Sequence, residues 1–203
     1  MARRKTHKRL RARYAVLGDG QTEQYYLKHL KVIKGYNYSV YPSLFNDITI
    51  ETASSKIDEL ISGGCDLIVY FTDYDTIVSQ GKQDKFNELI KKYDDTPQVL
   101  ICESMPSIEF WFLLHYKKTT REYTRADEVV QELKTFINNY SKGKAFLENP
   151  AWVVDLCNGE KLEIAVKRAK SILTQRQKQH VGKHFPFTKA HVGIEKFDKR
   201  KKS

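Results

Sequence analysis

Five apolar residues in a row, Leu67 to Phe71, stand in the first half of the chain with no polar residue between them. A strand that buries one face alternates apolar and polar residues, whereas a strand inside a parallel sheet is apolar throughout. The run therefore predicts a central strand of a parallel sheet, with helices covering both of its faces.

Strand-like and helix-like segments alternate around this run. Strands are expected at 13–17, 38–45 and 97–102, and helices at 23–34, 50–61, 81–93 and 106–116. Such alternation is typical of an α/β fold with a parallel sheet. Beyond residue 120 the strand signals fade, and helices are expected at 125–139 and 161–179, with a short apolar patch at 152–156.

Three parts of the chain follow from this pattern. We expect a basic arm at 1–12, an α/β domain at 13–120, and a mainly helical C-terminal extension with a basic tail at 121–203. The length of 203 residues favours one domain with an appendage.

Charge is unevenly spread along the chain. Residues 1–13 carry seven Lys and Arg and no acid, and residues 167–203 carry twelve Lys and Arg against two acids. Because the whole chain has a net charge of +10, the segment between these ends is acidic. Basic ends around an acidic body fit a protein that holds a nucleic-acid backbone against a carboxylate-rich cation site. The alternative is a pair of solubilising tails.

Other classes of protein are not favoured by this sequence. No apolar run approaches the length of a membrane span, and the first residues lack the apolar segment of a signal peptide. The three cysteines are far apart and odd in number, which predicts reduced thiols in a cytoplasmic protein. The histidines at 180, 184 and 191 are loosely spaced without matching cysteines, so a zinc site there is not expected.

Two aspartates, Asp73 and Asp75, follow the central apolar run with one residue between them. Ligands of open α/β sheets bind at the carboxyl ends of the strands. Two carboxylates leaving a buried strand can converge there on a hard cation such as Mg²⁺. The alternative is an Asp-rich turn that caps the next helix.

The turn from Gly18 to Glu23 has three interpretations. A dinucleotide-binding loop would need a third glycine where Glu23 stands, and an acid there would repel a pyrophosphate. Asp19 could be only a turn residue, with Glu23 complementing the helix dipole. Alternatively, Asp19 ends the first strand beside Asp73 and Asp75, and the three carboxylates hold one or two divalent cations.

Glu109 is the only charged residue in the apolar helix expected at 106–116. A helix that is apolar all round is buried, and a buried carboxylate without a partner is costly. Glu109 therefore needs a metal, a lysine or arginine, or backbone donors. His115 does not share a face with Glu109 and is expected to be a core histidine.

These three places together resemble the RloB-like family, restriction-linked proteins with a TOPRIM-type domain. The family pattern is a strand followed by EG-x-TE, a DxD after an apolar strand, and a proline followed by a phrase like S-F-E-x-W-x-L-L-H. This chain has Asp19-Gly20-Gln21-Thr22-Glu23, then Asp73-Tyr74-Asp75, then Pro106-Ser107-Ile108-Glu109-Phe110-Trp111-Phe112-Leu113-Leu114-His115. The match covers roughly residues 13–116, and Asp19 replaces the first glutamate.

The resemblance implies a TOPRIM-like, Rossmannoid α/β fold and a metal-dependent nuclease that cleaves DNA or RNA in bacterial defence against phage. It implies that Asp19 handles protons, with Glu23 taking part of that task, and that Asp19, Asp73 and Asp75 bind Mg²⁺ or Mn²⁺. Glu109 is implied as a further metal ligand or supporting residue. An ATPase partner of the AAA or ABC type is implied as well.

Two other functions stay open at this point. One is a non-catalytic module that binds nucleic acid or a protein partner on the same fold, suggested by Asp19 at the glutamate position. The other is a nucleotide-binding enzyme that uses the turn at Gly18.

Overall fold

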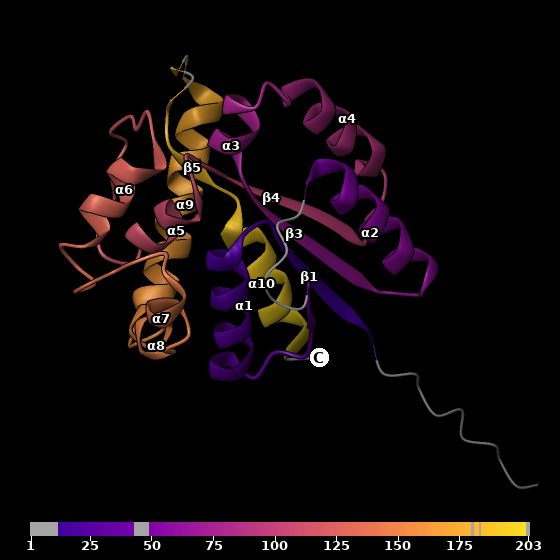
Figure 1. Cartoon of the computed structure of the whole chain (residues 1–203), viewed down its shortest axis with the longest axis horizontal. Coiled ribbons are helices and arrows are strands. Elements are labelled where there is room, and N and C mark those ends of the chain that lie inside the picture. The colour runs from indigo at the N-terminus through magenta and orange to yellow at the C-terminus, as the bar shows by residue number, and fades with distance from the viewer. Residues whose placement is uncertain (1–11, 43–48, 180, 183, 202–203) are drawn as a thin grey trace, which may run out of the picture.

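The computed structural model describes residues 12–42, 49–179, 181–182 and 184–201 (Figure 1). Most of the predicted basic arm, the end of the strand expected at 38–45, and His180 lie outside the described residues. Five strands form one sheet in the order β2-β1-β3-β4-β5. Their bounds are β1 Tyr14–Gly18, β2 Ser39–Tyr41, β3 Leu67–Asp73, β4 Val99–Met105 and β5 Phe187–Thr188.

The strand pairings make this a mostly parallel, Rossmann-like α/β sheet, as predicted. β1 lies between β2 and β3, β3 pairs with β4, and all three of these pairings are parallel. Only β5 runs antiparallel, pairing with the end of β4. The central position of β3 confirms the interpretation of its unbroken apolar run.

Each face of β3 is buried under a different layer of helices. Val69 and Phe71 belong to one hydrophobic cluster, and Ile68 and Tyr70 belong to the other. All four side chains are at most 1% exposed. Because successive side chains of a strand point to opposite faces, a run without polar residues is what a strand between two helical layers requires.

The two helical layers differ in size. The smaller layer covers the face of Ile68 and Tyr70 and consists of α2 (Ile50–Ser62), α3 (Tyr74–Ser79) and α4 (Gln83–Tyr93). The larger layer covers the opposite face and is shown in Figure 1 around α1 and α10. Its members are α1 (Gln21–Lys34), α5 (Ile108–Leu113), α6 (Ala126–Leu133), α7 (Lys144–Leu147), α8 (Ala151–Leu156), α9 (Lys161–Lys178) and α10 (Ala190–Lys201).

Residues beyond 120 take part in the sheet and its cover. β5 extends the sheet beside β4, and α10 packs against β4. A Cβ built on Gly193 of α10 would lie 2.8 Å from Cγ1 of Val69 and 3.0 Å from Cζ of Phe71. The helix therefore approaches β3 so closely that only glycine fits there.

Several predicted elements differ from the observed ones. The helix expected at 106–116 begins only at Ile108, because Ser107 has an extended backbone (φ −148°, ψ 175°). The apolar patch at 152–156 lies in α8, and α6 ends at Leu133. Helix α3, which starts directly after Asp73, was not expected.

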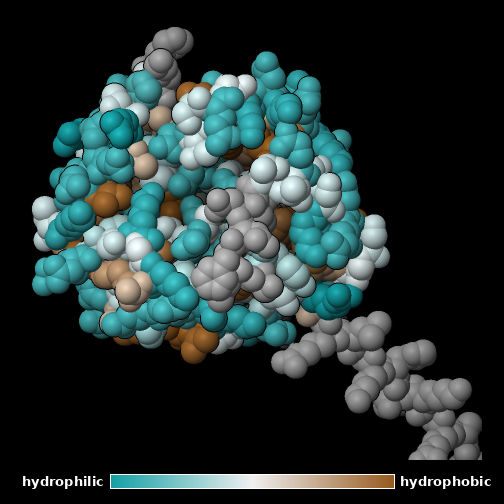
Figure 2. Space-filling model, in the orientation of Figure 1, coloured by the Kyte–Doolittle hydropathy of each residue, from teal (hydrophilic) through white to brown (hydrophobic). Residues whose placement is uncertain are grey.

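The surface shown in Figure 2 is mostly hydrophilic. On the side shown in Figure 2, hydrophilic side chains predominate and apolar ones are scattered among them. Within the described ranges, no helix combines the length and the apolar character that crossing a membrane requires.

Candidate active site

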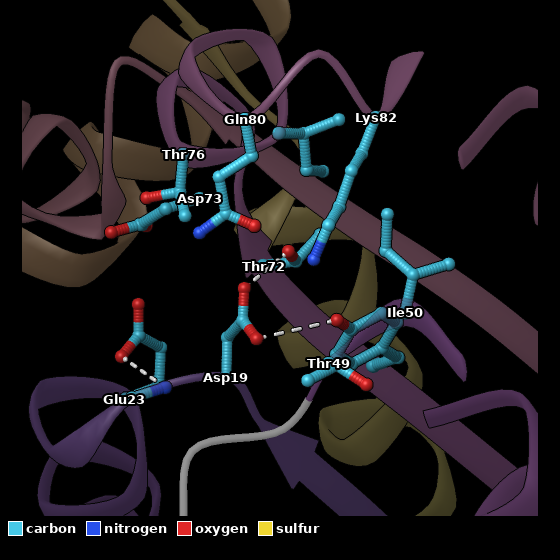
Figure 3. A pocket seen from close by; sticks show the side chains of 12 residues that line it. Asp19, Glu23, Thr49, Ile50, Thr72, Asp73, Thr76, Gln80 and Lys82 are labelled. Carbon is cyan, nitrogen blue, oxygen red and sulfur yellow. Dashed lines mark hydrogen bonds between the residues drawn. The ribbon is translucent and has the colours of Figure 1, made fainter. Parts of the chain in front are cut away.

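A cavity of about 290 Å³ opens at the carboxyl ends of β1 and β3 (Figure 3). Acidic side chains from the end of β1, from α1 and from the end of β3 line one side of it, and the helices α2, α3 and α4 approach from the other side. The lining residues are Asp19, Gly20, Glu23, Thr49, Ile50, Tyr70, Thr72, Asp73, Thr76, Ile77, Gln80 and Lys82. Three of the five predicted site residues are among them.

Asp19 is fixed by neighbours on β3. Its Oδ2 accepts a hydrogen bond of 2.6 Å from Thr72 Oγ1, and its Oδ1 accepts a longer one of 3.4 Å from the Tyr70 hydroxyl. Its backbone N–H donates to the carbonyl of Phe71. Because parallel strands end at the same edge, the turn after β1 meets the end of β3, as the sequence predicts.

Glu23 lies in the first turn of α1 with its carboxylate turned back to the turn before the helix. Its Oε2 accepts a hydrogen bond of 3.2 Å from the N–H of Gly20. The side chain is buried, and burial raises its pKa to about 7, with repulsion from Glu109 and Asp19 adding to the shift. Glu23 is therefore poised to exchange a proton near neutral pH.

Asp73 at the end of β3 lies close enough to Glu23 for each carboxylate to influence the pKa of the other. Its Oδ1 accepts a hydrogen bond of 2.7 Å from the N–H of Ile108, so it ties the end of β3 to the start of α5. Burial and repulsion from Glu23 and Glu109 raise the pKa of Asp73 well above its usual range. Figure 3 shows the carboxylates of Asp73 and Glu23 facing one another across the acidic side of the cavity.

Glu109 lies behind these two carboxylates and has found polar partners, as its burial requires. It is fully buried, and its oxygens accept hydrogen bonds from Ser107 Oγ at 2.5 Å and the Tyr140 hydroxyl at 3.1 Å. Lys142 Nζ forms an ion pair with Oε1 of Glu109 at 3.1 Å. Of the partners that the sequence left open, the structure shows a lysine, and it adds two hydroxyl groups that were not expected.

Lys142 also interacts electrostatically with the other acids of the cluster. Burial opposes its charge, but the fields of Glu109, Asp73 and Glu23 raise its pKa above the ordinary value. Lys142 therefore supplies positive charge behind the acidic side of the cavity.

Asp75 does not line the cavity with the other acids. It lies in the first turn of α3, where its N–H donates to the carbonyl of Pro106 and its Oδ1 accepts a weak hydrogen bond of 3.4 Å from Thr76. The structure thus brings Asp19, Glu23 and Asp73 together with Glu109 behind them, whereas Asp75 is not among the residues that line the cavity.

Several lining or supporting residues were not predicted from the sequence. Thr72, which donates a hydrogen bond to Asp19, could have been suspected because it directly precedes Asp73 in β3. Tyr140 and Lys142 lie far along the chain from Glu109 and have no local pattern that would reveal their role. Gln80 and Lys82 stand in the short connection after α3.

Asp19 and Asp73 are the cavity residues whose carboxylates could hold a divalent cation. Within the described ranges, no three or more His, Cys, Asp and Glu side chains form a group that could hold a metal ion. Mg²⁺ is usually held by only one or two carboxylates together with waters and substrate phosphates. Asp19 and Asp73 supply hard oxygen ligands of this kind, and a cation would relieve the repulsion that raises the pKa values of Glu23 and Asp73.

One comparison with known proteins gave a match. A protein-family model described as "RloB-like protein" matches residues 14–197, from the start of β1 into α10. No match was found among curated proteins or among solved structures.

Proposed function

The chain belongs to the RloB-like family, and from this premise we propose that it is a divalent-metal-dependent nuclease that hydrolyses DNA or RNA in bacterial defence against phage. The observation that carries the proposal is the meeting of Asp19, Glu23 and Asp73 in one cavity at the carboxyl ends of two parallel strands. A TOPRIM-type active site would use carboxylates in this position.

Each carboxylate has a distinct task in the proposed mechanism. Asp19 and Asp73 would hold Mg²⁺ or Mn²⁺, which when bound supplies a Lewis acid for the phosphodiester and for an attacking water. Glu23, with a pKa of about 7, accepts a proton from a water in the cavity. Thr72 keeps Asp19 oriented, and the ion pair of Glu109 with Lys142 limits the negative charge behind the site.

The test compares single aspartates that differ in position. Asp73→Asn keeps the hydrogen bond to Ile108 but removes the charge, and it should lower Mg²⁺-dependent cleavage of nucleic acid by about 100-fold or more. Asp75→Asn should have a smaller effect, because Asp75 does not line the cavity. Asp84→Asn, an exposed acid in the first turn of α4, is the matched control.

Two outcomes would contradict the proposed site. Cleavage by Asp73→Asn at the rate of the Asp84→Asn control would exclude the carboxylate cavity as the catalytic centre. A stronger loss in Asp75→Asn than in Asp73→Asn would place the catalytic centre at Asp75 instead of in this cavity. The predicted ATPase partner is tested separately, by co-expression of this chain with an AAA- or ABC-type ATPase followed by co-purification.

A second candidate is a non-catalytic module that binds nucleic acid or a protein partner. It is favoured by the hydrogen bonds and the ion pair of Glu109, which give this buried carboxylate protein partners without any ligand. This alternative predicts nucleic-acid binding without cleavage in Mg²⁺ or in Mn²⁺, and the same affinity in wild type and in Asp73→Asn.

A further inference from the structure

The side of the cavity opposite Asp19 and Glu23 carries a lysine and an amide. Gln80 ends α3 and Lys82 precedes α4, and both side chains line the cavity. Figure 3 shows them extending from the α3–α4 connection toward the space above Asp19 and Glu23. The cavity therefore has an acidic side and a side that donates hydrogen bonds.

Lys82 remains separate from the acids that share its cavity. Across the described part of the chain, Lys82 takes part in no ion pair, although Asp19, Glu23 and Asp73 line the same cavity. Asp19 is instead held by Thr72, and Asp73 by the N–H of Ile108. The partly buried Lys82 thus lines the same cavity as the carboxylates without an ion pair to a described residue.

The size and chemistry of that space indicate what fits between them. Its volume of about 290 Å³ lies just below the range of small-molecule sites, which is about 300–1,000 Å³. An anion that carries a bound cation would fill this space. Its negative oxygens would face Lys82, and its cation would face the carboxylates. A backbone phosphate of a nucleic acid is such an anion, and lysine binds phosphate as a point charge.

We propose that Lys82, supported by the amide of Gln80, binds a phosphate oxygen of the nucleic-acid backbone opposite the carboxylate side of the cavity. This assignment rests on the proposed nuclease function and names the residues that place the substrate in it. The start of α2, where Thr49 and Ile50 line the same cavity, adds a weak positive field in the same direction. Among the described residues, Lys82 is the only lysine or arginine that lines this cavity.

The test measures binding separately from cleavage. The probe is a fluorescein-labelled single strand of about 20 nucleotides, longer than most single-strand binding sites, made once as DNA and once as RNA. Binding is followed by fluorescence anisotropy with Ca²⁺ in place of Mg²⁺, over a series of NaCl concentrations. The variants are Lys82→Met, Lys82→Arg and Gln80→Leu, and the control is Lys91→Met, an exposed lysine in the last turn of α4 outside the cavity.

Loss of one phosphate contact has a defined signature. Lys82→Met should lower the affinity about five- to tenfold at low salt and reduce the slope of log K against log salt by about 0.7, the value for one phosphate of a single strand. Lys82→Arg should keep the wild-type slope, Gln80→Leu should weaken binding about twofold to threefold, and Lys91→Met should match the wild type. Thermal unfolding checks that each variant folds, and Lys82→Gln replaces any Lys82→Met preparation that does not.

The outcomes separate this assignment from the function on which it rests. If the wild type cleaves nucleic acid but Lys82→Met binds with the affinity and salt slope of Lys91→Met, the assignment of Lys82 is wrong and the nuclease stands. If the wild type neither binds nor cleaves either probe with any of these cations, both proposals are overturned. Cleavage by the wild type together with a shallower slope in Lys82→Met alone supports both.

Discussion

Replacing Glu23 by glutamine should make the protein more stable at neutral and alkaline pH when no divalent metal is present. Glu23 is buried, and its pKa is about 7 in the folded protein against 4.5 for an ordinary glutamate. The change to glutamine keeps an oxygen that can accept the hydrogen bond from Gly20 and removes only the titratable charge.

The direction of the effect follows from where the proton is bound. Below pH 4.5 the folded and unfolded chains both carry it, so Glu23 does not alter the free energy of unfolding. Between pH 4.5 and 7 only the folded chain keeps it, so the free energy of unfolding falls as the pH rises. One pKa unit corresponds to about 1.4 kcal/mol, so the loss reaches about 3 kcal/mol above pH 7.

Urea unfolding in EDTA measures this difference, with the fluorescence of the buried Trp111 and Trp152 as the signal. Glu23→Gln and the wild type should have similar stability at pH 4.5, and the variant should be about 3 kcal/mol more stable at pH 8. Glu88→Gln, the same change at an exposed position of α4, should follow the wild type at every pH. Parallel pH profiles for Glu23→Gln and the wild type would refute the reasoning.

Three further changes test the packing around the site. Lys142→Met should destabilise the fold by about 2 kcal/mol, because it leaves the buried carboxylate of Glu109 without its cation; adding Glu109→Gln should recover part of the loss, and a purely additive double variant in urea unfolding would contradict this. Gly193→Ala should lower the melting temperature by a few degrees, since overpacking costs about 1–3 kcal/mol and the gain in helix propensity only about 1 kcal/mol; an unchanged melting temperature would show that α10 can shift. Trp111→Phe should cost about 1–3 kcal/mol, because it removes the donor of the 2.8 Å hydrogen bond to Tyr26 and leaves a buried hydroxyl, and Trp111→Phe with Tyr26→Phe should lose less than the sum.

The sheet could be predicted from the sequence because its central strand carries an unmistakable local pattern. A run such as 67–71 has one explanation, burial on both faces, and both hydrophobic clusters confirm it. The burial of Glu109 followed in the same way from a helix that is apolar on all sides. The observed order of β1 and β3 also places Asp19 next to the end of β3.

Elements that depend on distant contacts could not be predicted in this way. Helix α3 contains the β-branched residues Thr76, Ile77 and Val78, which weaken helix propensity, and it is held by the burial of Ile77. Strand β5 has only two residues, too few for a period to be recognised.

The candidate site was predicted only in part for the same reason. Its acids could be found because they end strands or stand out in apolar helices, whereas Lys142 reaches Glu109 only through the folded chain. Lys82 lies in the connection between α3 and α4, whose sequence contains no recognisable motif. Asp75 lies in the first turn of α3, which starts directly after Asp73, and nothing in the DxD spacing indicates that helix.

The close approach of α10 to β3 has a consequence for how the molecule is made. A nascent chain contains β1 to β4 well before residues 187–201 are synthesised, so Val69, Phe71 and Cys102 then lack the helix that covers them. Such an intermediate exposes an apolar sheet face of the kind that aggregates or recruits chaperones. Translation that stops before α10 would therefore release an aggregation-prone, protease-sensitive fragment and not a smaller functional protein.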